Sequence, residues 1–377
     1  MCSSFRFGLL ISLWMLYLFP AALASAEPVQ KSLNPVVPQS PVTYENATIT
    51  EDVSWRGSVV VRGAVVVAPQ ATLRIEPGTE IRFMAATGSS QRPSLVVMGR
   101  IQAVGSPGEP ILFASAAASM QKKGAWGGIL LLSSEKRNQL EHCRIEGAEA
   151  AIEGRFSSVS LISVAISSST TGVVLRDSTV GMSKSSVSGC DTGIEVHDSE
   201  LELRDTVIDR NRRGAILFRS SVTMSVVSVT DNSLLGILAE EGRTRLTSCE
   251  VSGNGVGAYF KGGEGQLFMS RFNRNSVTGL HLAAARLKIN RCRIIENLRD
   301  GLQVEDDRAT IWGNAFGGNG GYDLFNAGPD NISAPLNWWD SGDEAAVKGR
   351  LSAVTRNGRS GIVNVFPWLL EKPLLLP

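Results

Sequence analysis

The sequence has few aromatic residues, few histidines and no excess of charge of either sign. Its 37 Lys and Arg residues balance 36 Asp and Glu residues, so the formal net charge is +1. Nucleic-acid-binding proteins normally carry a basic excess or a basic stripe, and this balance disfavours that class of partner. Only 19% of the residues are charged and 43% are hydrophobic, which excludes a disordered chain. The three histidines and five cysteines show no zinc-type spacing.

Long apolar runs are also lacking beyond the first residues, which excludes a multi-span membrane protein. The first segment combines Arg6, an apolar stretch over 8–19 and the small residues Ala24 and Ala26. This pattern predicts a signal peptide over 1–26, with an uncleaved anchor as the alternative. A proline-rich linker over 27–43 follows. We therefore expect an exported protein, periplasmic or extracellular, with no transmembrane span in its mature form.

What is abundant is repetition. A glycine that opens an alternating apolar stretch recurs at intervals of 21, 21, 22, 21, 22 and 22 residues. Intervals this even indicate a repeat architecture in which each unit stacks on the next. The glycines of this series are Gly172, Gly193, Gly214, Gly236, Gly257, Gly279 and Gly301.

Each repeat holds three short stretches with a period of two, as in 193–197, 200–203 and 206–208. Three strands in about 21 residues are too short for sandwich hairpins and predict a coil that pairs in parallel with the next coil. The fold class is therefore all-β, a right-handed parallel β-helix (solenoid) of 21–22 residues per coil over 44–366. The apolar residues 367–377 are expected to form a tail or cap, with attachment to a membrane or partner as the alternative.

Asparagines recur shortly before the repeat glycines. In a stacked coil they predict a structural ladder of side-chain amides, not a polar site. The six positions are Asn211, Asn232, Asn254, Asn275, Asn297 and Asn319. Cysteines share interior positions instead: Cys249 and Cys292 are two coils apart, about 9–10 Å, too far for a disulfide. We expect the four cysteines after the signal peptide to be buried free thiols.

The residues 65–83, with the run Ala71-Thr72-Leu73-x-Ile75-x-Pro77-Gly78-Thr79-x-Ile81-x-Phe83, resemble the opening of secreted bacterial right-handed β-helix proteins, the pectin-lyase-like superfamily. The segments 110–113, 126–129, 337–340 and 367–369 are similar to other motifs of these proteins. The resemblance covers about 44–369 and implies the β-helix fold. It leaves the function open, because the superfamily includes lyases, hydrolases, epimerases, adhesins and a periplasmic copper-binding accessory group.

The resemblance implies carboxylates as catalytic groups, with calcium as a cofactor if the protein is a lyase. Asp205 and Asp209, with Arg212 and Arg213 in the same coil, are the first candidates for acid–base work on a glycan. The alternative is a solvated edge of surface ion pairs. The histidines His197 and His281 lie four coils apart, about 19 Å, too far to share a metal, so no metal or other cofactor is expected.

Apolar residues occupy outward positions where a solvated strand should be polar. Ile216, Phe218, Leu238 and Tyr259 are expected to form an exposed apolar patch over three coils. Such a patch marks a ligand-binding surface, a surface covered by the chain's own C-terminal segment, or a patch without a role.

Together these observations predict a non-catalytic extracytoplasmic β-helix protein that binds a polysaccharide or another cell-envelope component. Two alternatives remain open: a polysaccharide-processing enzyme (lyase, hydrolase or epimerase) and a periplasmic copper-binding accessory protein. The sequence leaves the ligand and the oligomeric state undetermined.

Overall fold

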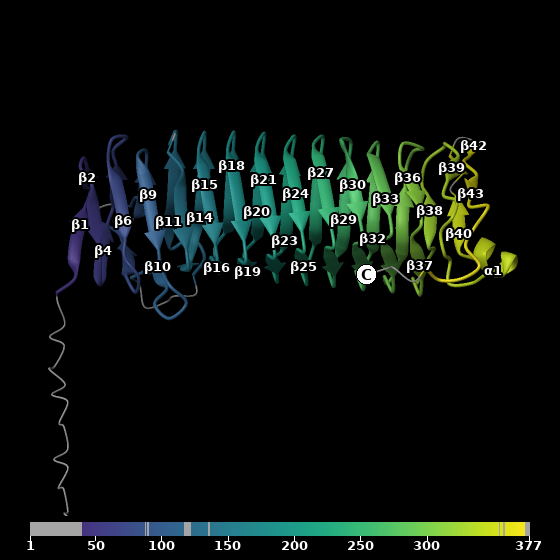
Figure 1. Ribbon diagram of the computed structural model, residues 1–377, viewed down its shortest axis with the longest axis horizontal. Helices are drawn as coiled ribbons and strands as arrows, with labels where there is room; N and C mark the ends of the chain where they lie inside the picture. Colours follow the sequence, from purple (N-terminus) through teal and green to yellow (C-terminus); the bar gives the residue numbers. More distant parts are fainter. Residues whose placement is uncertain are drawn as a thin grey trace, which may run out of the picture. The chain divides into compact units, whose positions relative to one another are not determined.

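Three long parallel sheets stack along one axis to form a right-handed β-solenoid of about 12 turns (Figure 1). The computed structural model describes residues 40–86, 88, 90–116, 122–134, 136–353, 355–356 and 359–373. The expected signal peptide, most of the expected linker and residues 374–377 lie outside these ranges. Each sheet takes every third strand of the chain, because one coil contributes one strand to each sheet. The β-helix predicted from the repeat is confirmed.

The first sheet, called sheet A, has 13 strands: β1 (Val42–Glu45), β4 (Ser58–Arg62), β7 (Glu80–Met84), β10 (Ile111–Ser115), β13 (Cys143–Glu146), β16 (Ala165–Ser167), β19 (Ser186–Ser188), β22 (Val207–Asp209), β25 (Ser228–Thr230), β28 (Glu250–Ser252), β31 (Arg271–Asn273), β34 (Arg293–Ile295) and β37 (Ala315–Gly317). Strand β1 pairs with β4, so the first strand of the described chain already belongs to this sheet.

Sheet B has 14 strands: β2 (Thr48–Ile49), β5 (Ala64–Val67), β8 (Ser94–Val97), β11 (Trp126–Leu132), β14 (Ala148–Arg155), β17 (Thr171–Arg176), β20 (Thr192–His197), β23 (Arg213–Phe218), β26 (Leu235–Glu240), β29 (Val256–Lys261), β32 (Thr278–Ala283), β35 (Asp300–Val304), β38 (Leu324–Asn326) and β40 (Leu351–Ala353).

Sheet C has 12 strands: β3 (Val53–Trp55), β6 (Thr72–Ile75), β9 (Arg100–Val104), β12 (Asn138–Glu141), β15 (Ser158–Ile162), β18 (Thr179–Ser183), β21 (Glu200–Arg204), β24 (Ser221–Ser225), β27 (Arg243–Thr247), β30 (Glu264–Phe268), β33 (Arg286–Asn290) and β36 (Thr310–Trp312).

Alternation along each strand places one set of side chains in a single continuous core and the other set in solvent. In β21, for example, Leu201 and Leu203 are buried while Glu200 and Glu202 are exposed. Because the strands pair in parallel and in register, the same position in each coil forms a column that runs along the solenoid. Both outward columns and inward columns arise in this way.

Buried asparagines line the corner between sheets A and B. The side-chain Nδ2 of Asn232 donates to Asn254 Oδ1 at 2.9 Å, and Asn254 Nδ2 donates to Asn275 Oδ1 at 3.1 Å. Equivalent bonds join Asn211 to Asn232, Asn275 to Asn297 and Asn297 to Asn319. The same side chains also bond the backbone of neighbouring coils, so the series closes this corner with satisfied hydrogen bonds.

The repeat glycines begin the strands of sheet B, where coils approach most closely. A Cβ atom at Gly214 would lie 2.4 Å from the carbonyl oxygen of Gly236 in the next coil. Only glycine permits this spacing, which is why the residue recurs at this position. The thiols of Cys143, Cys190, Cys249 and Cys292 are free and buried in the core.

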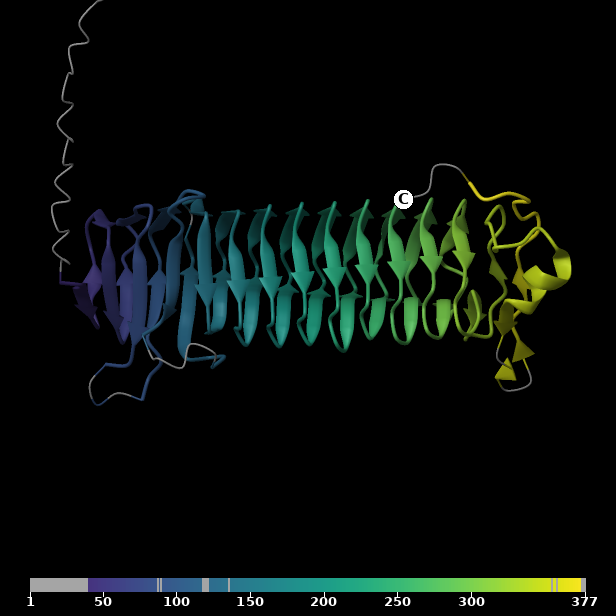
Figure 2. The ribbon, with the colours of Figure 1, turned by 90° about the horizontal axis from the view of Figure 1, so that it is seen from below.

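The C-terminal end departs from the repeat and closes the solenoid. It contains a short helix, α1 (Glu344–Gly349), which the sequence patterns did not predict because six residues carry no sustained period (Figure 2). Asp343 caps this helix by accepting a hydrogen bond from Ala346 N at 2.8 Å. Strand β39 (Ile332–Ser333) pairs with β43 (Val363–Asn364), and β41 (Thr355–Arg356) pairs with β42 (Arg359–Ser360).

The described part of the tail runs beside the last coil. Leu369 N donates to Asn337 O at 3.0 Å, and Trp368 Nε1 donates to Gly342 O at 3.3 Å. These bonds place Trp368 and Leu369 at the C-terminal end of the solenoid. The helix α1 is far too short to cross a bilayer, and the described chain contains no other helix.

Candidate functional site

The residues predicted as a ligand-binding surface lie side by side on the outward face of sheet B. Ile216, Leu238 and Tyr259 are register partners on β23, β26 and β29, and Phe218 faces outward two residues after Ile216. Ile216 is only 6% exposed, because parallel stacking places a neighbour on each side of it. The apolar patch is therefore smaller than predicted. Its role as a ligand-binding surface stays a prediction.

The aromatic side chains of this face stack on histidines from an adjacent coil, which is the preceding coil for Phe218 and the next coil for Tyr259. The rings of Tyr259 and His281 lie 4.3 Å apart at 11°, and those of His197 and Phe218 lie 5.0 Å apart at 20°. Because each stack joins adjacent coils, the ring faces lie across the solenoid axis and their edges point outward. A sugar that stacks on an aromatic ring needs an open ring face. Tyr259, between Leu238 and His281, offers none.

Each of these two histidines contacts a carboxylate. His197 Nε2 lies 3.0 Å from Glu195 Oε1, and His281 Nε2 lies 2.9 Å from Glu305 Oε1. Burial, and next the charge of Glu305, raise the pKa of the Tyr259 hydroxyl above its usual value. Tyr259 therefore stays a neutral hydroxyl at physiological pH and does not supply a base.

The structure spreads the predicted catalytic residues around two corners of one coil. Asp205 occupies the turn between β21 and β22 with a φ of 48°, and Asp209 ends β22, where its carboxylate pairs with Arg210 at 2.9 Å. Three residues separate the two aspartates, so their Cα atoms are at most about 13 Å apart. Arg212 and Arg213 lie beyond the next corner, where β23 begins. These four residues do not converge on one site, and their catalytic role stays a prediction.

A groove, not predicted from the sequence, runs along the outward face of sheet C. Two hollows of about 710 and 460 Å³ follow one another over the strands from β15 to β33, and a third of about 550 Å³ lies beside the second, at the corner between sheets B and C. Ser221 and Thr223 line both the first and the second hollow, while Arg243 and Arg286 line both the second and the third. The hollows therefore form one groove over seven adjacent strands, about 29 Å long at the usual strand spacing.

Each of these strands has two outward positions on this face, two residues apart, and we call such a pair of residues a rung. The strands β15, β18 and β24 supply small rungs, β21 supplies an acidic rung, and β27 and β33 supply basic rungs. In chain order the rungs are Ser158 with Ser160, Thr179 with Gly181, Glu200 with Glu202, Ser221 with Thr223, Arg243 with Arg245, Glu264 with Gln266, and Arg286 with Lys288. Small side chains make the floor low, and charged side chains stand above it.

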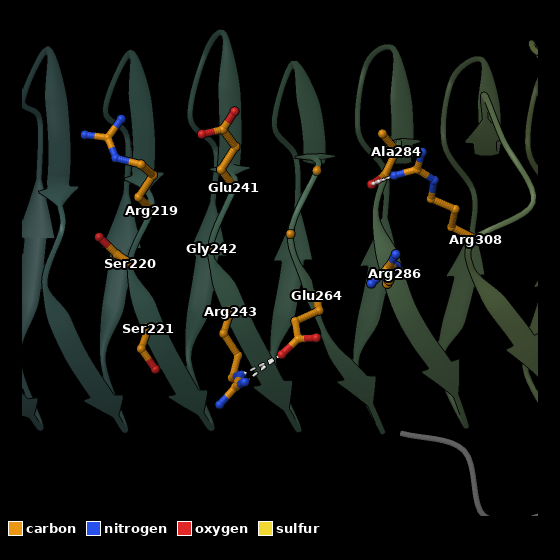
Figure 3. A pocket seen from close by; sticks show the side chains of 12 residues that line it. Arg219, Ser220, Ser221, Glu241, Gly242, Arg243, Glu264, Ala284, Arg286 and Arg308 are labelled. Carbon is orange, nitrogen blue, oxygen red and sulfur yellow. Dashed lines mark hydrogen bonds and ion pairs between the residues drawn. The ribbon is translucent and has the colours of Figure 1, made fainter.

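The C-terminal end of the groove extends to the corner between sheets B and C (Figure 3). There Gly262 and Ala284 interrupt a column of charged residues that includes Arg219 and Glu241, which deepens the hollow. Arg219 pairs with Asp198 through two hydrogen bonds of 2.8 and 2.7 Å, and these bonds lower the pKa of the Asp198 carboxyl. The Asp198 charge thus already compensates this arginine.

The sequence does indicate this groove, but on the strands of sheet C, whereas the outward residues considered in the sequence analysis are those of sheet B. Sequence reasoning followed the outward positions of the strand after the repeat glycine, which belongs to sheet B. The strand that follows it carries serine, threonine and glycine at outward positions two residues apart, as at Thr179 and Gly181. A stripe of small outward residues beside charged ones indicates a hollow surface.

Comparison with known proteins identifies the fold. Residues 47–158 match the pectate-lyase-like beta helix domain family, and residues 117–279 match the family described as periplasmic copper-binding protein (NosD). No curated protein sequence matches the chain. The chain therefore has the fold of pectate-lyase-like β-helix proteins.

Solved structures with this fold are similar at low identity. A point mutant of the periplasmic alginate epimerase AlgG is 11% identical, over 88% of this chain and 79% of that one, with a TM-score of 0.45. The A-module of Azotobacter vinelandii mannuronan C-5 epimerase AlgE6 is 12% identical, over 88% and 91%, with a TM-score of 0.33. Pectate lyase Pel9A is 13% identical, over 81% and 71%, with a TM-score of 0.31. At these identities the likeness concerns the fold alone.

The match to the copper-binding family raises the question of a metal site. In the residues that the structure describes, no three His, Cys, Asp or Glu side chains gather where they would hold a metal ion. Met182 and Met224, which carry soft thioether ligands, are buried in the core. No copper chemistry is derived from the match to this family.

Proposed function

We propose that the protein is an exported, non-catalytic binding protein that holds a polysaccharide chain lengthwise in the groove of sheet C. The observation that carries this proposal is the continuity of the groove over seven parallel strands. An open groove about 29 Å long suits an extended polymer and leaves a small molecule largely exposed. A cell-envelope polysaccharide is accessible to an exported protein.

The chemistry of the groove suits a hydroxyl-rich ligand. Serine and threonine side chains on β15, β18 and β24 offer donors and acceptors to sugar hydroxyls, and the charged rungs offer stronger hydrogen bonds. The groove lies on paired strands whose backbone is held by the sheet, so binding orders little of the protein.

The test is a variant that fills the groove without disturbing the fold. A Cβ atom at Gly181 meets no atom within 4 Å, so Gly181→Trp places an indole ring in the groove. Gly108 has the same open surroundings on a turn outside the groove, and Gly108→Trp is the matched control. We expect the first variant to weaken polysaccharide binding at least about tenfold and the second to leave it unchanged, because only the first occupies the ligand's place.

Binding is measured by gel retardation with neutral and acidic polysaccharides, with and without calcium. Equal retardation of both tryptophan variants contradicts binding in the groove. In that case loss of binding in Tyr259→Ala would transfer the site to the apolar face of sheet B.

One observation favours the alternative, a polysaccharide-processing enzyme. Glu200 and Glu202 both face the groove from one strand, with Cα atoms about 6.6 Å apart. A pair of neighbouring carboxyl groups is what glycosidases use for acid–base or nucleophilic catalysis. New reducing ends in the same incubations, abolished by Glu200→Gln or Glu202→Gln, would establish this activity.

A further inference from the structure

We propose that the basic rungs on β27 and β33 bind oxyanion groups of an acidic glycan, and that the acidic rung on β21 excludes such groups. This inference rests on the proposed function, because it names the class of polysaccharide that the groove accepts. The shared chemistry is a carboxylate, sulfate or phosphate group carried on an extended chain.

The first observation is a local excess of positive charge. The second hollow is lined by four cations, Arg243, Arg245, Arg286 and Lys288, against one carboxylate, Glu264. All four cations are exposed. The net charge of the whole chain is only +1, so the excess of positive charge in this hollow is local.

The second observation is that three of these cations are uncompensated. Arg243 donates through two nitrogens to Glu264 Oε1, at 3.0 and 2.6 Å (Figure 3). Within the described parts of the chain, no hydrogen bond or ion pair engages the side chains of Arg245, Arg286 or Lys288. Their charges are available to a ligand, and the exposed Arg243–Glu264 pair is a weak competitor.

The third observation is the spacing. Arg286 and Lys288 are two residues apart on one strand, about 6.6 Å, and Arg245 lies two strands from Lys288, about 9.6 Å. An oxyanion between such positions is within reach of two long side chains. One guanidinium group can donate two parallel hydrogen bonds to two oxygens of a carboxylate, sulfate or phosphate group, so arginine is suited to this role.

The fourth observation is the opposite charge further along the same groove. Glu200 and Glu202 form the acidic rung two strands before β27. Glu202 pairs with Arg204 at 3.1 Å, whereas no ion pair of Glu200 occurs in the described chain. Anionic groups are therefore attracted at β27 and β33 and repelled at β21, and the acidic part of the ligand must lie toward the C-terminal end of the groove.

The test uses dextran sulfate and carboxymethyl-dextran, with neutral dextran of the same length as control and inorganic pyrophosphate as a competitor. We expect both acidic dextrans to bind at about 50 mM salt and to weaken at about 200 mM, because salt screens exposed charges. Arg245→Gln combined with Lys288→Gln should weaken binding about tenfold. Glu200→Gln combined with Glu202→Gln should strengthen it about threefold.

The matched control removes the same charge elsewhere. Arg144 on sheet A and Lys184 in a turn are exposed and lie outside the groove, so Arg144→Gln with Lys184→Gln should leave binding unchanged. Equal losses in the two double variants would overturn the inference, and so would a failure of all the probes to bind. Relative affinities for the sulfated, carboxymethylated and phosphate probes identify the oxyanion.

The inference and the proposed function fail in different ways. If neutral dextran binds as tightly as the acidic dextrans, the oxyanion assignment is wrong while the polysaccharide groove stands. If pyrophosphate binds and depends on Arg245 and Lys288 but no polymer binds, the oxyanion site stands and the polysaccharide function is wrong.

Discussion

Replacing one asparagine of the buried series should cost far more stability than replacing an asparagine outside it. Asn254 is fully buried and its side chain makes four hydrogen bonds: Oδ1 accepts from Asn232 N and Nδ2, and Nδ2 donates to Val229 O and Asn275 Oδ1. The substitution Asn254→Ala removes all four and leaves the two donors of Asn232 in a closed corner without those acceptors. At about 1 kcal/mol for each lost bond and more for each orphaned donor, we expect a loss of about 3–5 kcal/mol.

The matched control is Asn290→Ala. Asn290 is half-buried, and its side chain makes one hydrogen bond, to Trp312 O at 2.9 Å, so the expected loss is about 1 kcal/mol. The assay is urea unfolding followed by circular dichroism, with the shift of the midpoint converted through the common slope. If Asn254→Ala is no more destabilising than Asn290→Ala, then the buried series does not stabilise the solenoid and the reasoning is refuted.

Two further predictions concern the interior. Burial raises the pKa of the Cys143 and Cys292 thiols to about 12, so both stay protonated and unreactive at a pH of about 8. In the protein without its predicted signal peptide, a thiol reagent should label the four cysteines only in denaturant. Rapid labelling of the native protein would contradict the burial. Gly236→Ala places a Cβ atom 2.4 Å from Gly257 O and should lower the urea midpoint markedly, whereas Gly181→Ala, in open space, should not.

The fold could be predicted from the sequence because a parallel solenoid constrains every coil in the same way. The close approach at Gly214 recurs one coil later, so the same requirement for glycine recurs 22 residues later. Alternation within each repeat then separates the buried Leu201 and Leu203 from their outward neighbours. Periodicity in the sequence is thus a direct record of the stacking.

The candidate site could not be predicted in the same way, because it depends on neighbours across coils. Ile216 occupies an outward position, yet the side chains above and below it cover it. Asp205 and Asp209 are close in sequence, yet Asp205 lies in the turn before β22 and Asp209 ends that strand at the next corner. The groove arises only when small residues such as Gly181 align over several strands, and no single repeat contains it.

The regular strand spacing alone would not fix the position of a polymer bound along the solenoid axis. A uniform surface would present the same environment after each shift of about 4.8 Å, so a bound chain could slide from coil to coil without loss. The unequal rungs of sheet C remove this equivalence, since a shift by one strand moves a ligand group from Arg245 to Gln266. Sequence differences between coils of the same shape would thus give a polymer bound along sheet C one preferred position and one direction.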